Sequence, residues 1–345
     1  MSSYQKNKTL VLNIVAIFMG LGVSFIIGEI TSRIYFFGMD GLSYKKVSSF
    51  MPVGVSGYLS GSKNYKVLYE LKPNIDDYFK LTTFKTNSQG CRDKEYSVAK
   101  PKKTIRGLVI GDSFTMGSGV EIEQVYHSVV ERNLNGKQDG INYELINFGV
   151  GGYNLLNYNG ILEHKALQYD PDFIVIGFCG NNDFMLPNEK HYQGNYRVKV
   201  KNKAKNPFFS SYLMGWIKNT ILPRKKITTK TFFAISEKER AFVEKMFNEF
   251  RMFSENNNIP IIINFISILE DNGNLQIIKN LALKNGLYFV DATGDIDPDS
   301  FEDYCINKLD HHPNGMANRI FADALLSFDP LNTILNKKKE ELLSE

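Results

Sequence analysis

The chain has 345 residues, of which 43% are hydrophobic, and a formal net charge of +4 at pH 7. This length allows one large domain or two smaller ones, and the apolar content is sufficient for a packed core. A net charge this small gives no indication of a nucleic-acid partner. The three cysteines, Cys91, Cys179 and Cys305, cannot all pair with one another. The sequence does not decide whether Cys91 and Cys305 form a disulfide. Cys179 lies in an apolar run and is expected to be a buried thiol.

The N-terminal region contains the longest uncharged stretch of the chain. Residues 1–8 are polar and carry Lys6 and Lys8, and the 18 residues from Leu10 to Ile27 carry no charge. A helix needs about 20 apolar residues to span a bilayer. We expect a tail at residues 1–8 and an uncleaved transmembrane anchor at residues 9–30. The alternatives are a cleaved signal peptide, whose apolar region is usually about 7–15 residues, and a buried helix of a soluble domain.

Residues 31–103 are expected to form a juxtamembrane connector followed by a β-rich extension. Alternating polar and apolar residues at 78–86 predict short strands or a hairpin, and residues 87–90 read as a turn. Arg92 follows this turn. It is a candidate either to line the mouth of a site or to form a surface ion pair.

Residues 104–330 alternate between strand-like and helix-like patterns. Strands are predicted at residues 105–110, 143–147, 172–178, 259–265 and 288–290. Helices are predicted at residues 124–134, 155–169 and 237–256, at 275–285, and after Pro313, which fits a first helical turn. Such alternation predicts a three-layer, doubly wound parallel sheet of the flavodoxin-like type. The last residues, 331–345, read as a charged tail.

An insertion at residues 185–235 interrupts this alternation. It contains a lysine-rich stretch at residues 199–205, an apolar stretch at residues 212–217 and a basic cluster at residues 224–226. So long an insertion is usually functional. It is either a lid or an interfacial helix at a membrane, or else a packed helix with a solvated basic loop.

The chemistry of the chain centres on residues 105–119, which read IRGLVIGDSFTMGSG. The apolar strand at 105–110 ends at Gly111-Asp112-Ser113, so Ser113 is expected at the carboxyl edge of the sheet, where α/β folds bind ligands. The stretch lacks the Gly-Lys-Ser/Thr ending of a phosphate loop and the spacing of a dinucleotide fingerprint.

Four ordered motifs carry a resemblance to a known family. They are Gly111-Asp112-Ser113-Phe114, the glycine-rich stretch from Asn147 to Gly152, Gly180-Asn181-Asn182-Asp183, and Asp310-His311-His312-Pro313-Asn314. In this order they resemble the four blocks of the SGNH (GDSL) hydrolases, and the chain is identified as a membrane-anchored member of that family. The resemblance implies an SGNH-hydrolase fold, an ester-cleaving serine and no cofactor.

A serine hydroxyl becomes nucleophilic when an imidazole takes its proton and a carboxylate orients that imidazole. We assign these roles to Ser113, His312 and Asp310, because alternate residues of an extended loop point the same way. His311 is the competing base. The family more often has Asp-x-x-His, where this chain has Asp-x-His. A metal site is an alternative interpretation of Asp310-His311-His312, although the sequence has no third or fourth ligand at a fixed spacing from this motif.

The resemblance also supplies three donors for an oxyanion. They are the N–H groups of Ser113 and Gly152 and the side-chain amide of Asn182. The glycines of this block permit close approach of the backbone to a ligand. Asp112, Arg92 and Asn181 are candidates to line the substrate site.

These expectations together predict a serine esterase or an O-acyl (acetyl) transferase. Its substrate would be an acyl ester of a cell-envelope or exported glycan. Anchored relatives place this domain outside the cytoplasm, so we expect an extracytoplasmic, single-pass membrane protein. The alternatives are a lipid esterase or lysophospholipase at the membrane surface, and a non-catalytic envelope-assembly protein that keeps the fold.

Overall fold

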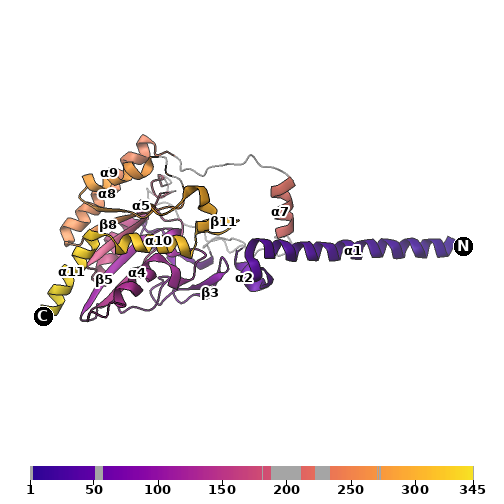
Figure 1. The fold of residues 1–345 in the computed structure, drawn as a ribbon, viewed down its shortest axis with the longest axis horizontal. Coiled ribbons are helices and arrows are strands. Elements are labelled where there is room, and N and C mark those ends of the chain that lie inside the picture. Colours follow the sequence, from indigo (N-terminus) through magenta and orange to yellow (C-terminus); the bar gives the residue numbers. More distant parts are fainter. Residues whose placement is uncertain are drawn as a thin grey trace. The chain divides into compact units, whose positions relative to one another are not determined.

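The computed structural model describes residues 3–50, 57–180, 182–187, 211–221, 234–269, 271 and 273–344 (Figure 1). The chain divides into two compact units. The first contains the N-terminal residues to Pro52 together with Lys203–Thr228, and the second contains the remainder. Most of the predicted insertion, residues 188–210 and 222–233, lies outside the described residues.

The first unit is helical. Helix α1 (Ser3–Phe37) is followed by η1 (Gly38–Leu42) and α2 (Tyr44–Phe50), and α7 (Tyr212–Ile221) packs against α1. The large apolar side chains from Leu10 to Ile27 are 43–69% exposed. Residues Asn7–Leu42 are long and apolar enough to cross a membrane, with a mean hydropathy of 2.6 in the most apolar stretch.

The junction of α1 and α7 is organised by Glu29. Its carboxylate accepts hydrogen bonds from Ser211 Oγ at 2.7 Å and from the Leu213 N–H at 3.0 Å, and it pairs with Arg33 at 2.9 Å. A carboxylate at a helix N-terminus satisfies N–H groups that have no partner inside the helix. Helix α7 of the insertion therefore folds onto the carboxyl-terminal end of α1.

The second unit is built on a five-stranded parallel sheet, as predicted. Its strand order is β6-β5-β7-β8-β9. The strands are β5 (Thr104–Gly111), β6 (Asn142–Asn147), β7 (Phe173–Cys179), β8 (Ile261–Ile266) and β9 (Tyr288–Asp291). Three small antiparallel pairs surround the sheet: β1 (Leu59–Gly61) with β2 (Tyr69–Leu71), β3 (Asp76–Phe79) with β4 (Thr82–Lys85), and β10 (Cys305–Asn307) with β11 (Asp310–Pro313).

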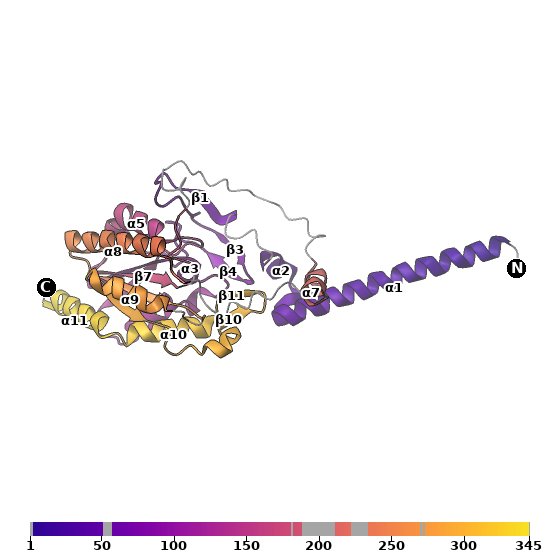
Figure 2. The same ribbon diagram turned by 90° about the horizontal axis from the view of Figure 1, so that it is seen from above.

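Helices cover both faces of the sheet and make it a three-layer fold (Figures 1 and 2). One face packs against α5 (Leu155–His164), α8 (Glu237–Asn257) and α9 (Asn274–Lys284). The other packs against α4 (Tyr126–Asn135), α10 (Gly315–Leu326) and α11 (Asp329–Ser344). Leu108 and Ile110 of β5 join the first core and Ile105 and Val109 the second, as the two-residue period of a strand requires. Short 3₁₀ turns, η3 (Ile122–Gln124), η4 (Ala166–Tyr169) and η6 (Pro298–Tyr304), and α3 (Ser113–Met116) complete the unit.

Two local features differ from the sequence expectations. Pro313 does not open the last predicted helix, because it pairs with Cys305 in the β10–β11 hairpin. Asn314 caps α10 instead, and its side-chain oxygen accepts hydrogen bonds from the N–H groups of Met316 and Ala317. Residues 331–344, expected as a charged tail, form most of α11, whose Leu331 and Leu335 are buried.

All three cysteines are free and buried. Burial raises the pKa of both Cys91 and Cys305 to about 12.

Candidate active site

The site begins at the sharp turn between β5 and α3. Asp112 caps α3, because its Oδ1 accepts the Phe114 N–H at 2.8 Å, and Ser113 is the first helical residue. A Cβ at Gly111 would lie 2.0 Å from Thr115 Oγ1 and 3.0 Å from the Gly177 carbonyl. Only glycine therefore allows the strand to turn this tightly beneath Ser113.

The β10–β11 hairpin brings His312 to this turn. His312 Nε2 lies 2.9 Å from Ser113 Oγ, and His312 Nδ1 is hydrogen-bonded to Asp310 Oδ1. The same carboxylate oxygen accepts the His312 N–H at 3.1 Å, which fixes the Asp-x-His segment. His311 points elsewhere: it is exposed, and its ring meets that of Phe301 edge-on at 5.4 Å. The arrangement can relay a proton from the serine to the imidazole.

A lysine that the sequence analysis missed completes this group. Lys80 Nζ lies 2.6 Å from Asp310 Oδ2 and 3.0 Å from His312 Nδ1. Burial raises the pKa of Asp310, but the His312 hydrogen bond and charge and the Lys80 charge outweigh it, so that pKa is held well below its usual range. Burial also lowers the pKa of Lys80, and Asp310 opposes that shift.

The oxyanion candidates lie on two further loops. Asn182 follows β7 and borders the same pocket as Ser113. Gly152, on the loop after β6, has φ +83°, and a Cβ there would lie 2.9 Å from Tyr69 Oη. The loop is packed tightly against α3: Asn147 Nδ2 donates to the Thr115 carbonyl at 3.0 Å, and a Cβ at Gly149 would lie 2.4 Å from the Met116 nitrogen. Gly152 is not among the described residues that line the pocket.

The pocket over Ser113 has a volume of about 450 Å³. Its described lining residues are Asp112, Ser113, Phe114, Cys179, Asn182, Leu309, Asp310, His311 and His312. Of the residues predicted to line a substrate site, Asp112 borders the pocket but is buried and caps α3, and Asn181 lies outside the described residues.

Arg92 has neither of the positions expected for it. It is only 1% exposed, so it neither forms a surface ion pair nor borders the described pocket over Ser113. Its guanidinium donates to the carbonyls of Met116 at 2.8 Å, Gly117 at 2.5 Å and Val120 at 2.5 Å. Five donors in a rigid fork suit this position, where several carbonyls of one loop converge. Arg92 thus holds the loop that follows α3.

Two buried carboxylates lie beneath the site. Burial raises the pKa of Asp112, although hydrogen bonds from Phe114 and Asn182 and the charge of His312 oppose it. Burial also raises the pKa of Asp183 well above its ordinary value, and the charge of Asp112 adds to this. Asp183 Oδ2 accepts hydrogen bonds from Tyr158 Oη at 2.8 Å and from the Cys179 N–H at 2.6 Å.

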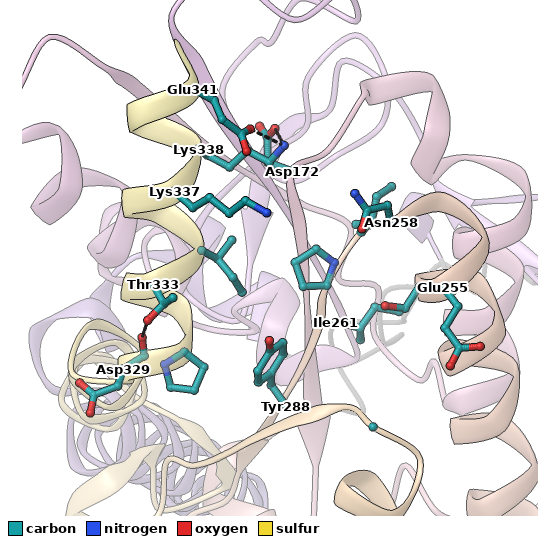
Figure 3. Close-up of a pocket in the computed structure, with 16 residues that line it drawn as sticks. Asp172, Glu255, Asn258, Ile261, Tyr288, Asp329, Thr333, Lys337, Lys338 and Glu341 are labelled. Atoms are coloured by element: carbon teal, nitrogen blue, oxygen red, sulfur yellow. Dashed lines mark hydrogen bonds and ion pairs between the residues drawn. The ribbon is translucent and has the colours of Figure 1, made fainter. Parts of the chain in front are cut away.

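A larger pocket, of about 740 Å³, lies at the amino ends of the strands (Figure 3). It is bordered by Asp172, just before β7, by Ile261 and Tyr288 at the starts of β8 and β9, and by α11. Lys338 in this pocket contacts Asp172 and Glu341 (Figure 3). Because the strands are parallel, this pocket is at the edge of the sheet opposite Ser113.

Within the described residues, no group of three or more His, Cys, Asp or Glu side chains could hold a metal ion.

Comparisons with known proteins place the chain in a family. The sequence profile of the GDSL-like Lipase/Acylhydrolase family matches residues 108–325. No curated protein matches the sequence. Among solved structures, an acetyl xylan esterase is 19% identical, with 65% of this chain and 98% of that chain covered and a TM-score of 0.39. An acetyl xylan esterase from Geobacillus stearothermophilus is 14% identical (64% and 93% covered, TM-score 0.40). A two-domain esterase active on acetylated mannans is 16% identical (69% and 50% covered, TM-score 0.42). The family profile covers more than half of the chain, and the chain therefore belongs to the GDSL-like (SGNH) lipase/acylhydrolase family of serine ester hydrolases.

Proposed function

We propose that this esterase removes or transfers short O-acyl groups, chiefly acetyl groups, on a cell-envelope or exported glycan. In this proposal Ser113 is the nucleophile, His312 is the general base and Asp310 orients His312. The observation that carries the proposal is the unbroken line of contacts from Asp310 through His312 to Ser113. A protein that had kept only the fold would have no need to hold these three side chains in line.

The reaction follows from these contacts. Ser113 Oγ attacks the acyl carbonyl carbon while His312 Nε2 takes the hydroxyl proton, and a tetrahedral intermediate forms. The ester C–O bond then breaks, and the departing sugar oxygen receives the proton from His312. Water or a second sugar hydroxyl, deprotonated by His312, then attacks the acyl carbon of the acyl-Ser113 ester. The bond from that carbon to Ser113 Oγ breaks, Oγ takes the proton back from His312, and the acyl group leaves as the free acid or as the new sugar ester. Asp310 remains ionised throughout and stabilises the imidazolium.

Three groups are proposed to stabilise the oxyanion: the N–H groups of Ser113 and Gly152 and the side-chain amide of Asn182. Asn182 supports this role by its place in the pocket beside Ser113. Ser113 lies in the first turn of α3, where N–H groups have no partner within the helix. Donors fixed in advance at this position lower the barrier because they need no reorganisation during the reaction.

The described pocket supports a short acyl group. Apart from Phe114, Cys179 and Leu309, its described lining side chains are polar or charged. A fatty acyl chain would require a longer apolar surface than these residues provide. Sugar hydroxyl groups, in contrast, can bond to the polar groups at the rim.

Turnover of p-nitrophenyl esters of increasing chain length tests this proposal. We expect acetyl to be preferred and the Ser113→Ala variant to be inactive. A preference for long chains would favour a lipid esterase, and equal rates for both proteins would contradict the role of Ser113. Mass spectrometry of envelope glycans and lipids, with and without the protein, then identifies the natural acyl ester.

We also propose that α1 is an uncleaved anchor that leaves the esterase domain outside the cytoplasm. Support comes from the end of α1, where Glu29 binds the start of α7 and the Phe37 ring meets those of Phe50 and Tyr212 at 4.7 and 5.0 Å. A signal peptide would be lost, whereas this end of α1 is part of a folded unit. The intact mass of the protein from purified membranes checks this, and the loss of residues 1–30 would contradict it.

A further inference from the structure

Lys80 occupies an unusual turn. It and Leu81 form the two-residue connection between β3 and β4, and their φ angles are +50° and +75°. Two-residue hairpin turns with positive φ at both positions normally contain asparagine, aspartate or glycine, because other side chains are strained there. A lysine and a leucine at these positions are not what the turn itself prefers. The contacts of Lys80 offer the explanation.

The ammonium group of Lys80 bridges two members of the proposed triad. It lies 2.6 Å from Asp310 Oδ2 and 3.0 Å from His312 Nδ1, and its side chain is only 11% exposed. Asp310 uses its other oxygen for His312. Each carboxylate oxygen therefore has its own partner, and the carboxylate cannot rotate without breaking one of the two contacts.

The charge of Lys80 acts on His312 as well. For Nε2 to accept the Ser113 proton, Nδ1 must carry the proton shared with Asp310. A positive charge 3.0 Å from Nδ1 opposes a second proton on the ring and partly cancels the attraction of Asp310 for the imidazolium. Asp112, which is buried behind Ser113, also interacts electrostatically with His312.

We propose that Lys80 is a positioning residue, which holds the Asp310 carboxylate in place and sets a positive charge beside His312 Nδ1. The inference rests on the proposed roles of Ser113, His312 and Asp310. It predicts that removing the charge moves the acid limb of the pH profile to higher pH. A lysine that only held the hairpin in place would change stability without moving that limb.

The test compares kcat/KM for p-nitrophenyl acetate across about pH 5–9 in four variants. Lys80→Met removes both the charge and the N–H donors, Lys80→Gln removes the charge but keeps an N–H donor on a side chain one bond shorter, and Lys80→Arg keeps the charge. Lys85→Met is the matched control, because Lys85 belongs to the same hairpin and forms an exposed ion pair with Asp76 at 3.3 Å. Circular dichroism establishes that each variant is folded.

We expect the acid limb of Lys80→Met and of Lys80→Gln to move up by about one pH unit. Lys80→Met should also lose about tenfold in kcat/KM on the pH plateau, because the Asp310 carboxylate is no longer held in place. Lys80→Arg should keep the wild-type limb, and Lys85→Met should match the wild type throughout. If Lys80→Met does not fold, Lys80→Gln decides alone.

An unmoved acid limb in the neutral variants, or one that moves to lower pH, overturns the inference. Ser113→Ala measured alongside separates this failure from that of the proposed function. If Ser113→Ala is inactive and the pH profiles of the Lys80 variants match the wild type, only the proposed role of Lys80 is wrong. If Ser113→Ala is active, the proposed roles of Ser113, His312 and Asp310 are wrong.

Discussion

His312 Nε2 lies 2.9 Å from Ser113 Oγ, although 199 positions separate the two residues in the chain. The contact depends on two separate segments of the chain. The β5–α3 corner presents Ser113 at the carboxyl edge of the sheet, and the β10–β11 hairpin carries His312 over that edge. Asp310 and Lys80 then fix the ring from its far side.

Replacing Asn182, one of the three proposed oxyanion donors, should reduce the rate and leave substrate binding nearly unchanged. In Asn182→Ala we expect kcat to fall by about 10²–10³-fold with little change in KM, because the amide acts on charge that develops only in the transition state. Steady-state kinetics with p-nitrophenyl acetate measure both constants. An unchanged kcat in a folded variant would show that Asn182 is not an oxyanion donor.

Removing the titratable carboxyl group of Asp183 should change how stability depends on pH. Its folded-state pKa is raised, so the folded state holds a proton that the unfolded chain has already lost above about pH 4. Stability contributed by that proton is present at low pH and is lost as the pH rises toward the folded-state pKa. Asp183→Asn should therefore have a higher Tm than the wild type at pH 8 and a smaller advantage, or none, at pH 5.

Thermal unfolding at several pH values checks this prediction. Asp76→Asn is the control, since Asp76 is exposed and pairs with Lys85 on the surface. Equal Tm changes at pH 5 and pH 8 would show that Asp183 is not buried with a raised pKa.

Arg92 should matter for stability far more than for chemistry. Arg92→Met leaves the carbonyls of Met116, Gly117 and Val120 buried without their donor, and we expect a loss of about 3–5 kcal/mol in the free energy of unfolding. Urea unfolding measures this loss. Arg132→Met is the comparison, because Arg132 is exposed and bonds one carbonyl, that of Glu123. Similar losses in the two variants would contradict the account of Arg92.

Local sequence pattern was enough to predict the sheet, the corner at Ser113 and the pairing of Asp310 with His312. The strand at residues 105–110 is apolar and ends at glycine, so both the buried strand β5 and the corner at Ser113 follow from a short stretch. The side chains of Asp310 and His312 share one side of β11, as alternation along an extended segment predicts. Each of these features depends on residues close together in the chain.

The contacts of Lys80 and Arg92 could not be predicted from the sequence, because their partners are distant in the chain or are backbone groups. Lys80 is separated from His312 by 232 positions, and nothing in the hairpin pattern specifies that contact. Arg92 binds carbonyl groups, which carry no sequence signal. Positive φ at both residues of the turn could have been suspected only once the two-residue hairpin was known.

The most direct test of the account is covalent labelling of the nucleophile. A fluorophosphonate reacts with an activated serine and leaves a stable adduct, which peptide mass spectrometry locates. We predict one adduct per folded molecule, on Ser113, absent in Ser113→Ala and formed at least tenfold more slowly in His312→Ala. An adduct on another residue, or labelling at the wild-type rate in His312→Ala, would contradict the proposed triad.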